Sequence, residues 1–325
     1  MRIVEPDLSG EEAVREIARL ERAAAAGDAD AGWRLARHAL KDESDAKRFR
    51  KAKHLLAAGL AQRYPPAQRL AGVMLMRGNG SPPDEAAGLA LILEAAWAGE
   101  LNAVMDAALA HELGAGCRAD PAKALYWWRL AAARGVAAAM RRVAVALKEG
   151  RGCESDAEGA RAAAYAALKA GDAEAGFLLA DWMSRPADPL YDDEAAVSVL
   201  TETALAGHAQ AQYRLGLRHW AGRGVRVNQR EALRWFARAA ENEDVRALFM
   251  LAQLFLTGTL VALDRTSAAA LLRRGKQLGD AQAAAALKSL APLLRRTDLS
   301  AVRAKLSASR DTPALIESLL PRRGR

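Results

Sequence analysis

Residues 209–242, AQAQYRLGLRHWAGRGVRVNQREALRWFARAAEN, are the stretch of sequence that decides the fold. Ala211 and Leu215 stand four residues apart, which places them on one face of an α-helix. Gly222-Arg223-Gly224 breaks this pattern, and a second run of small and apolar residues follows from Ala232 to Ala240. The stretch therefore predicts two helices joined by a turn.

The same pattern recurs along the chain with a period of 36 residues. A shift by one period aligns eight alanines in one column, which are Ala31, Ala67, Ala103, Ala139, Ala175, Ala211, Ala247 and Ala283. Five residues later, seven copies carry another small residue, namely Ala36, Gly72, Ala108, Ala144, Ala180, Gly216 and Ala252. A third column is bulky and apolar and contains Leu56, Ile92, Trp128, Leu200, Phe236 and Leu272. The quoted stretch is thus one copy of a repeat.

Small residues on both helices of a copy allow close approach of the two backbones, and the bulky column fills the remaining space. Gly99, Gly135, Gly171 and Gly207 stand where a helix C-terminus needs a left-handed residue. Because one such hairpin cannot bury its faces alone, neighbouring copies must stack. The sequence predicts an all-α protein, a right-handed α-solenoid of about seven 36-residue helix-turn-helix repeats.

Capping helices are expected at both ends of the array, because a soluble solenoid must cover its exposed terminal faces. Ser9 and Glu12 form a capping box, which predicts a helix from about Gly10 to Ala26. Asp298–Leu306 and Pro313–Leu320 are predicted as short helices after the last repeat. The expected parts are an N-terminal cap over residues 1–26, the solenoid over 27–290, and C-terminal caps with a basic tail over 291–325.

These residues resemble Sel1-like repeats, which are relatives of the tetratricopeptide repeat. That family's pattern is close to A-x-A-x-x-x-L-G-x-x-Y-x-x-G-x-G-V, followed by a second helix with A-x-x-W-[YF]-x-x-A-A-x-x-G. The sixth copy matches it at Ala209, Ala211, Leu215, Gly216, Gly222, Gly224, Val225, Ala232, Trp235, Phe236, Ala239 and Ala240. In the first and fifth copies the sequences KDESD and SRPADPLYDD replace the glycine turn. The resemblance implies an adaptor that assembles protein complexes, as in bacterial envelope, secretion or signalling pathways.

Composition favours a globular protein with a large core. Of the 325 residues, 51% are hydrophobic and 26% are charged. No run of 18 or more apolar residues occurs, and the start, MRIVEPDLSGEE, is acidic where a secretory signal would be basic and then apolar. We expect a cytoplasmic location.

Three motifs could be read as catalytic or metal-binding, and each favours a structural role. Gly222-Arg223-Gly224 lacks the third glycine of a dinucleotide loop. His111-Glu112 begins like a zinc protease motif, but residue 115 is Ala, so the second ligand is missing. Cys117 and Cys153 lie one repeat apart, about 10 Å, which is too far for a disulfide. We expect free thiols and predict no catalysis, no cofactor and no metal site.

The net charge of +8 is concentrated at the ends of the chain. Residues 31–72 carry a net +7, including KRFRKAK at 47–53, and residues 295–325 carry +5. Such ends could bind nucleic acid or another anionic surface, or they could be solvated. A scaffold for envelope, secretion or exopolysaccharide-export complexes is a second alternative.

The side of the first helices that faces away from the small-residue columns is predicted to bind a protein or peptide partner of acidic character. By analogy with tetratricopeptide repeats, this side lines a groove, and its aromatic and arginine side chains are typical of protein interfaces. The alternative is that the rings pack between successive first helices. The predicted partner-binding residues are Arg141, Phe177, Tyr213, Arg214, Leu217, Arg218, Trp220 and Phe249.

Overall fold

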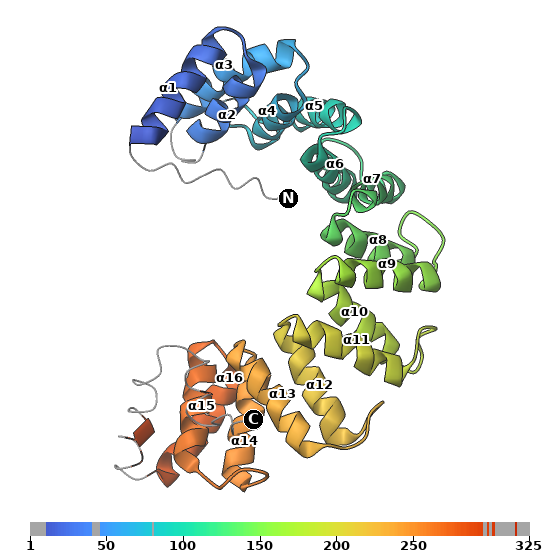
Figure 1. Cartoon of the computed structure of the whole chain (residues 1–325), viewed down its shortest axis with the longest axis vertical. Helices are drawn as coiled ribbons and strands as arrows, with labels where there is room; N and C mark the ends of the chain where they lie inside the picture. The colour runs from blue at the N-terminus through green and yellow to red at the C-terminus, as the bar shows by residue number, and fades with distance from the viewer. Residues whose placement is uncertain are drawn as a thin grey trace. The chain divides into compact units, whose positions relative to one another are not determined.

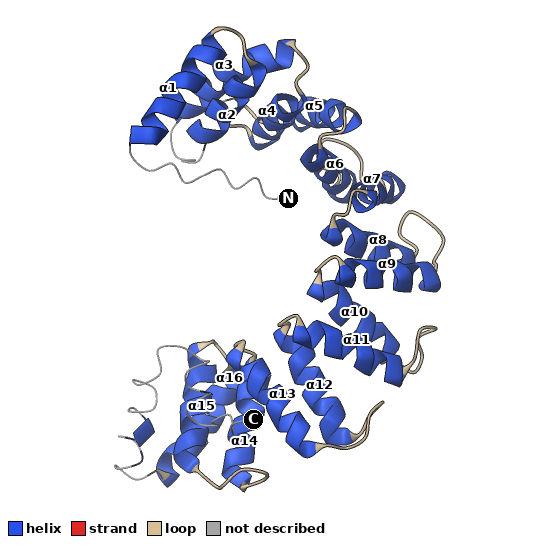
Figure 2. Ribbon diagram, in the orientation of Figure 1, coloured by secondary structure: helices blue, strands red, loops and turns tan. Residues whose placement is uncertain are grey.

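The computed structural model describes residues 11–40, 46–79, 81–294, Asp298, Ala301, Val302 and Ile316. Within these residues the regular structure is entirely helical (Figure 2). In chain order the elements are α1 (Glu11–Ala25), α2 (Ala29–Ala39), α3 (Ala46–Ala61), α4 (Pro65–Arg77), α5 (Glu85–Trp97), α6 (Leu101–Leu113), α7 (Pro121–Ala133), α8 (Ala137–Glu149), α9 (Ala157–Lys169), α10 (Ala173–Met183), α11 (Asp193–Leu205), α12 (Ala209–Ala221), α13 (Gln229–Glu241), α14 (Val245–Thr257), α15 (Arg265–Gln277), α16 (Ala281–Leu290) and the short 3-10 helix η1 (Ala291–Leu293).

The helices alternate as the repeat predicts. Even-numbered helices from α2 to α16 are the first helices of the repeats, and odd-numbered helices from α3 to α15 are the second ones. The quoted stretch forms α12 and α13, which pack against each other (Figure 1). The chain is an α-solenoid of helical hairpins, as predicted.

Two compact units divide the chain, Met1–Asp156 and Ala157–Arg325. The first unit holds α1 to α8, and the second holds α9 to α16, so the boundary falls inside the fourth repeat. The division into caps and solenoid that the sequence suggests stays a prediction.

A periodic set of caps starts and ends the helices. Asp192, Asn228 and Asp264 stand one repeat apart, and each side chain accepts a hydrogen bond from a backbone N–H in the first turn of the following second helix. Gly222 ends α12 with a φ of 73°, and Gly207 follows α11 with a φ of 90°. Both angles are left-handed, so a residue without a Cβ is favoured at each turn.

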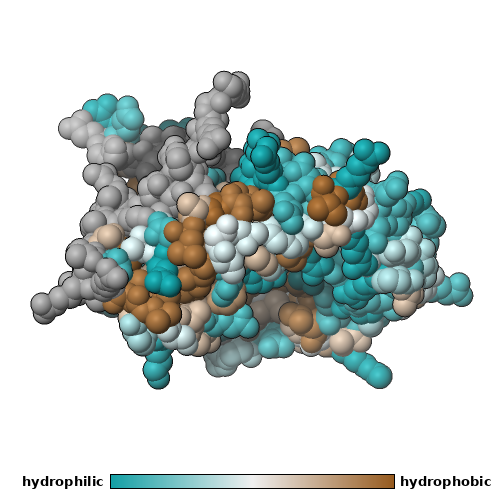
Figure 3. Space-filling view, turned by 90° about the horizontal axis from the view of Figure 1, so that it is seen from below, coloured by the Kyte–Doolittle hydropathy of each residue, from teal (hydrophilic) through white to brown (hydrophobic). Residues whose placement is uncertain are grey.

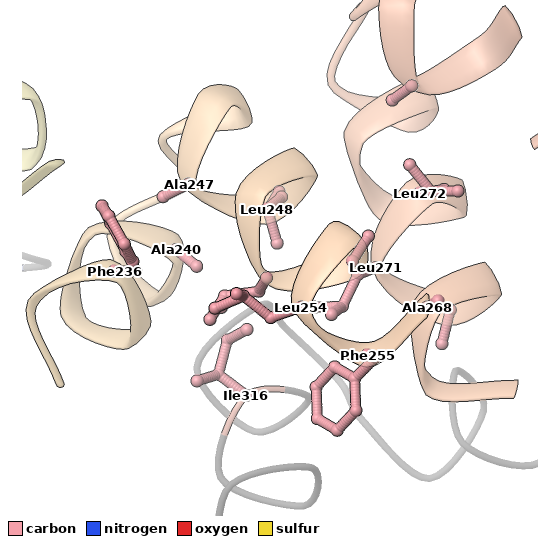
Figure 4. Packing of buried hydrophobic residues seen from close by; sticks show 14 of the residues in the cluster. Phe236, Ala240, Ala247, Leu248, Leu254, Phe255, Ala268, Leu271, Leu272 and Ile316 are labelled. Carbon is pink, nitrogen blue, oxygen red and sulfur yellow. The ribbon is translucent and has the colours of Figure 1, made fainter. Parts of the chain in front are cut away.

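The aligned columns form the core. Every member of the first alanine column is 3% exposed or less, which confirms that it lies between closely packed helices. The bulky column is buried as well, and Phe236 and Leu272 belong to one cluster with Leu248, Leu254 and Leu271 (Figure 4). The small and bulky columns therefore hold the positions that the sequence predicts for them.

Helix α1 packs against α2 and confirms the predicted N-terminal helix, while Ser9 of the proposed capping box lies outside the described residues. Of the two predicted C-terminal helices, Asp298, Ala301, Val302 and Ile316 are described, and all are helical. Val302 and Ile316 are buried in the cluster of the last repeats, where Figure 4 shows Ile316 beside Leu254. The predicted role of this segment as a cap stays a prediction. None of the described helices is long and apolar enough to cross a membrane.

Candidate partner-binding surface

An arginine–aromatic face runs across three first helices of the second unit and consists of Phe177, Tyr213, Arg214 and Arg246. Phe177 lies on α10, Tyr213 and Arg214 lie on α12, and Arg246 lies on α14. The Cζ atom of Arg214 lies 4.8 Å from the centre of the Phe177 ring, and Cζ of Arg246 lies 4.9 Å from that of Tyr213. Each ring is thus covered by an arginine of the next repeat, in the geometry of a cation–π contact.

Aspartates fix the orientation of both arginines. Nη1 of Arg214 donates to Oδ1 of Asp181 at 2.6 Å, and Nη2 of Arg246 donates to Oδ2 of Asp244 at 2.7 Å. The arginine side chains remain 38% and 45% exposed, respectively. Because a guanidinium has five N–H donors, each arginine can bind a further carboxylate without releasing its aspartate.

A second group of charges lies next to this face, where α12 meets the start of α11. Arg218 is buried and donates to the Asp193 carboxylate and to the Ser184 hydroxyl. Nε of Arg223 donates to Oδ2 of Asp193 at 3.1 Å. Burial of Asp193 favours its neutral form, but the hydrogen bonds from Arg218 and Arg223 outweigh burial and hold the pKa of this carboxyl below its usual value.

Each of two aspartates is shared by two arginines in this region. Asp181 pairs with both Arg185 and Arg214, and Asp193 pairs with both Arg218 and Arg223. Each group therefore contains two guanidinium charges and one carboxylate charge.

The predicted site residues fall into three environments. Phe177, Tyr213 and Arg214 come together on the arginine–aromatic face, whereas Arg141 lies on α8 in the first unit. Arg218 is only 7% exposed, so its guanidinium is used inside the second unit and orients Asp193.

The remaining predicted side chains lie half-buried against the hydrophobic cluster of the last repeats, and they are Leu217, Trp220 and Phe249. The ring centres of Trp220 and Phe236 lie 6.4 Å apart, and those of Tyr213 and Phe236 lie 5.8 Å apart. The rings therefore contribute to the core as well as to the surface, and they offer less free area than the sequence suggested.

Sequence reasoning missed Asp181, Asp193 and Arg246. Arg214 follows Asp181 by 33 residues and Phe177 by 37, and Arg246 follows Tyr213 by 33. The contact of Arg214 with Phe177 spans 37 residues, one more than the period. The other two contacts span 33 residues, three fewer than the period, so none of the three appears when the sequence is aligned with a period of 36. A search for opposite charges and for arginine–aromatic pairs at these two offsets would have found Asp181 and Arg246. It would have missed Asp193, which pairs with Arg218 at an offset of 25 and with Arg223 at an offset of 30.

The residues that resemble catalytic or metal-binding motifs are placed as follows in the structure. Within the described part of the chain, no group of three or more His, Cys, Asp or Glu residues could hold a metal ion. His111 is buried, with Nδ1 3.4 Å from Sγ of Cys117, and burial lowers the pKa of this histidine. Cys117 and Cys153 are free thiols.

The basic run at 47–53 lies on α3, and Nζ of Lys51 is 3.8 Å from Oε1 of Glu21. Residues 317–325 of the basic tail lie outside the described residues.

Two solved structures have a fold similar to that of this chain. The structure resembles that of c5321, a protective antigen of uropathogenic Escherichia coli with an SLR fold, at a TM-score of 0.59 and 22% identity, over 89% of this chain and 72% of that one. It also resembles a Sel1 repeat protein from Oxalobacter formigenes, at a TM-score of 0.54 and 23% identity, over 74% of this chain and 96% of that one. At these identities the likeness shows the fold alone. No curated protein matches the sequence.

The Sel1 repeat model matches residues 65–99, 102–136, 137–166, 209–244 and 245–280. The first and fifth copies, which lack the glycine turn, are not matched, yet the fifth still folds as the hairpin of α10 and α11. The matched segments cover more than half of the sequence with the period seen in the structure, and the chain belongs to the Sel1 repeat family.

Proposed function

We propose that this protein is a non-catalytic scaffold that binds an acidic segment of a partner protein on the arginine–aromatic face. The observation that carries the proposal is a pair of half-exposed arginines, Arg214 and Arg246, each held in place by an aromatic ring and an aspartate. Membership of the Sel1 repeat family, whose members commonly assemble protein complexes, supports the same reading. A bacterial, cytoplasmic setting is part of this proposal.

The geometry of the face favours binding because its charged groups are already ordered. Arg214 is held between the Phe177 ring and Asp181, and Arg246 between the Tyr213 ring and Asp244. A long side chain that is fixed before binding loses little conformational entropy when a partner carboxylate arrives. The rings beneath the guanidinium groups add flat apolar contact next to each charge.

The test uses arginine variants, because truncation of the half-buried rings would also damage the core. Arg214→Gln with Arg246→Gln removes both exposed charges, while Asp181 keeps Arg185 and Asp244 keeps its backbone hydrogen bonds. Arg234→Gln is the matched control, because Arg234 is 76% exposed on α13 and pairs only with Glu231 among the described residues.

Tagged wild type, the double variant and the control are used for affinity purification from the native host, with mass spectrometry of the captured proteins. We expect at least one protein to be captured by wild type and control and lost by the double variant, with unchanged melting by circular dichroism. Equal capture of every protein by all three would contradict the assignment of the face.

A further inference from the structure

The loops that join first to second helices in the second unit share an exposed apolar residue. Tyr191, Val227 and Leu263 stand one repeat apart and are 45%, 62% and 60% exposed, respectively. Each directly precedes the residue that caps the following helix, so all three lie at the same place in their loops. The loops follow one edge of the second unit (Figure 1). We call these three residues the apolar row.

The folding of the loops does not require side chains of this size. Val227 lies against Gly222, and Leu263 lies against Gly258, the glycines that end α12 and α14. In the first unit, Ala119 and Ser155 occupy the equivalent positions and lie against Gly114 and Gly150 in the same way. Alanine and serine therefore suffice for the turn. Val227 and Leu263 thus expose more apolar surface than the turn needs, whereas Tyr191 also uses its hydroxyl to donate to Oδ2 of Asp193 at 3.0 Å.

Exposed arginines lie beside Val227 and Leu263 of the row, whereas acidic residues, Asp192 to Glu194, follow Tyr191. Arg226, Arg230 and Arg265 are exposed and have no ion-pair or hydrogen-bond partner among the residues that the structure describes. Arg230 and Arg265 also lie in the first turns of α13 and α15, where the helix dipole disfavours a cation. This differs from the arginine–aromatic face, whose arginines are paired. An anionic partner at the edge would relieve both the repulsion and the apolar exposure.

We propose that the apolar row is a second docking site, which binds an extended acidic segment of a partner protein with an apolar side chain at every third residue. Successive repeats are about 10 Å apart, and an extended chain in the polyproline II conformation advances by about 3.1 Å per residue with three residues per turn. Every third side chain therefore points to the same face, and one turn spans one repeat. The partner's apolar side chains then contact Tyr191, Val227 and Leu263, and its carboxylates between them meet the free arginines. This site lies beyond the proposed function and is formed by other residues.

A protein segment fits the edge better than a lipid surface does. The apolar side chains stand singly, one on each loop, and the carboxylates of Asp192 and Asp264 follow two of them directly. A membrane would have to accept these carboxylates together with the apolar residues, whereas a peptide can pass between them. Seen from below, the surface has its largest hydrophobic area toward the left of the view and smaller hydrophobic groups among hydrophilic residues elsewhere (Figure 3).

The probe is a synthetic peptide of three Glu-Leu-Glu triplets, with Lys-Leu-Lys and Glu-Gly-Glu peptides as controls. Binding to the full chain is measured by fluorescence anisotropy at low and at physiological salt. We expect the Glu-Leu-Glu peptide to bind, and the other two to bind at least about tenfold more weakly.

Two variants test the row itself. Val227→Ser with Leu263→Ser introduces the residue that the first unit has at Ser155. This double variant should lower the affinity for the Glu-Leu-Glu peptide by about tenfold or more. Arg226→Gln with Arg230→Gln should lower the affinity for the same peptide and make that affinity less dependent on salt concentration. Leu205→Ser is the matched control, because Leu205 is 67% exposed in the same unit but lies outside the row.

Arg214→Gln with Arg246→Gln should leave the affinity for the peptide unchanged, which separates this site from the arginine–aromatic face. Absence of peptide binding, or equal binding by the row variants and wild type, overturns the proposal. Row-dependent binding to phosphatidylserine vesicles without peptide binding also overturns it and assigns the edge to a lipid surface.

Discussion

Replacing Gly216 with alanine tests the close packing between the two helices of a repeat. Gly216 on α12 lies against the ring of Phe236 on α13. A Cβ atom at this position would stand 2.5 Å from Cε1 and 2.6 Å from Cδ1 of the ring, well inside van der Waals contact. Phe236 is fully buried, so the ring has no free space into which it could move. We expect Gly216→Ala to strain this contact.

Two opposing contributions set the size of the effect. Overpacking a dense core costs about 1 to 3 kcal/mol, whereas glycine to alanine in a helix interior stabilises by about 1 kcal/mol. The net loss for Gly216→Ala is therefore about 0 to 2 kcal/mol. Phe236→Leu alone removes part of a buried ring and leaves a cavity, which costs about 1 kcal/mol or more.

In the repeats on either side of this one, alanine stands in place of Gly216 and leucine in place of Phe236. Ala180 pairs with Leu200 in the fifth repeat, and Ala252 pairs with Leu272 in the seventh, and all four residues are buried. Gly216→Ala combined with Phe236→Leu reproduces these pairs. The double variant should therefore lose less stability than the two single variants together, by about 1 kcal/mol or more.

The assay is urea unfolding followed by circular dichroism for wild type, both single variants and the double variant. Because the coupling is a difference between losses, it is insensitive to the general helix propensity of alanine, which acts equally in both backgrounds. Additive losses would refute the inference that Gly216 is small because Phe236 is large. Unchanged slopes of the transitions would show that all four proteins unfold with the same exposure of surface.

Two further predictions concern the core and the buried charges. Ala139 is fully buried between helices, so Ala139→Leu should lower the free energy of unfolding by about 1 to 3 kcal/mol, and an unchanged urea midpoint would contradict the alignment of the repeats. Asp193→Asn should destabilise by about 3 kcal/mol at neutral pH, because Arg218 is left buried without its anionic partner. Since the folded pKa of Asp193 is lowered from 3.8, its stabilisation is present above that pH and is lost as the pH falls through the lowered value, so urea midpoints of wild type and variant should converge in acid.

The sequence predicts the hairpins because their signals are local and periodic. Ala211 and its seven equivalents mark the contact between helices, and glycines such as Gly222 mark the turns. Each signal needs only the residue's own size or backbone freedom, and the period repeats the signal many times. The fifth repeat shows how robust the result is, since α10 and α11 form although SRPADPLYDD replaces the glycine turn.

Pairings between long side chains could not be predicted in the same way. Arg214 and Arg218 stand one turn apart and look equivalent in the sequence, but Arg214 is partly exposed above Phe177, whereas Arg218 is buried beside Asp193. The difference arises from neighbouring repeats, which supply the aspartates and the ring. Tyr213 and Trp220 show the same effect, because contact with Phe236 places them half inside the core.

Departures from the shared columns carry more information about binding than the columns themselves. The position that packs against the first glycine of the turn needs only a small side chain, as Ala119 and Ser155 show, so the larger Val227 and Leu263 support the proposed role outside the hairpin. The same reasoning applies to arginines, because an unpaired guanidinium next to exposed apolar surface raises the energy of the free protein. A partner that covers the exposed apolar side chains and pairs with the free guanidinium groups removes both unfavourable contributions, and this adds to its affinity. Such positions therefore indicate binding surfaces that the strongest repeat matches do not.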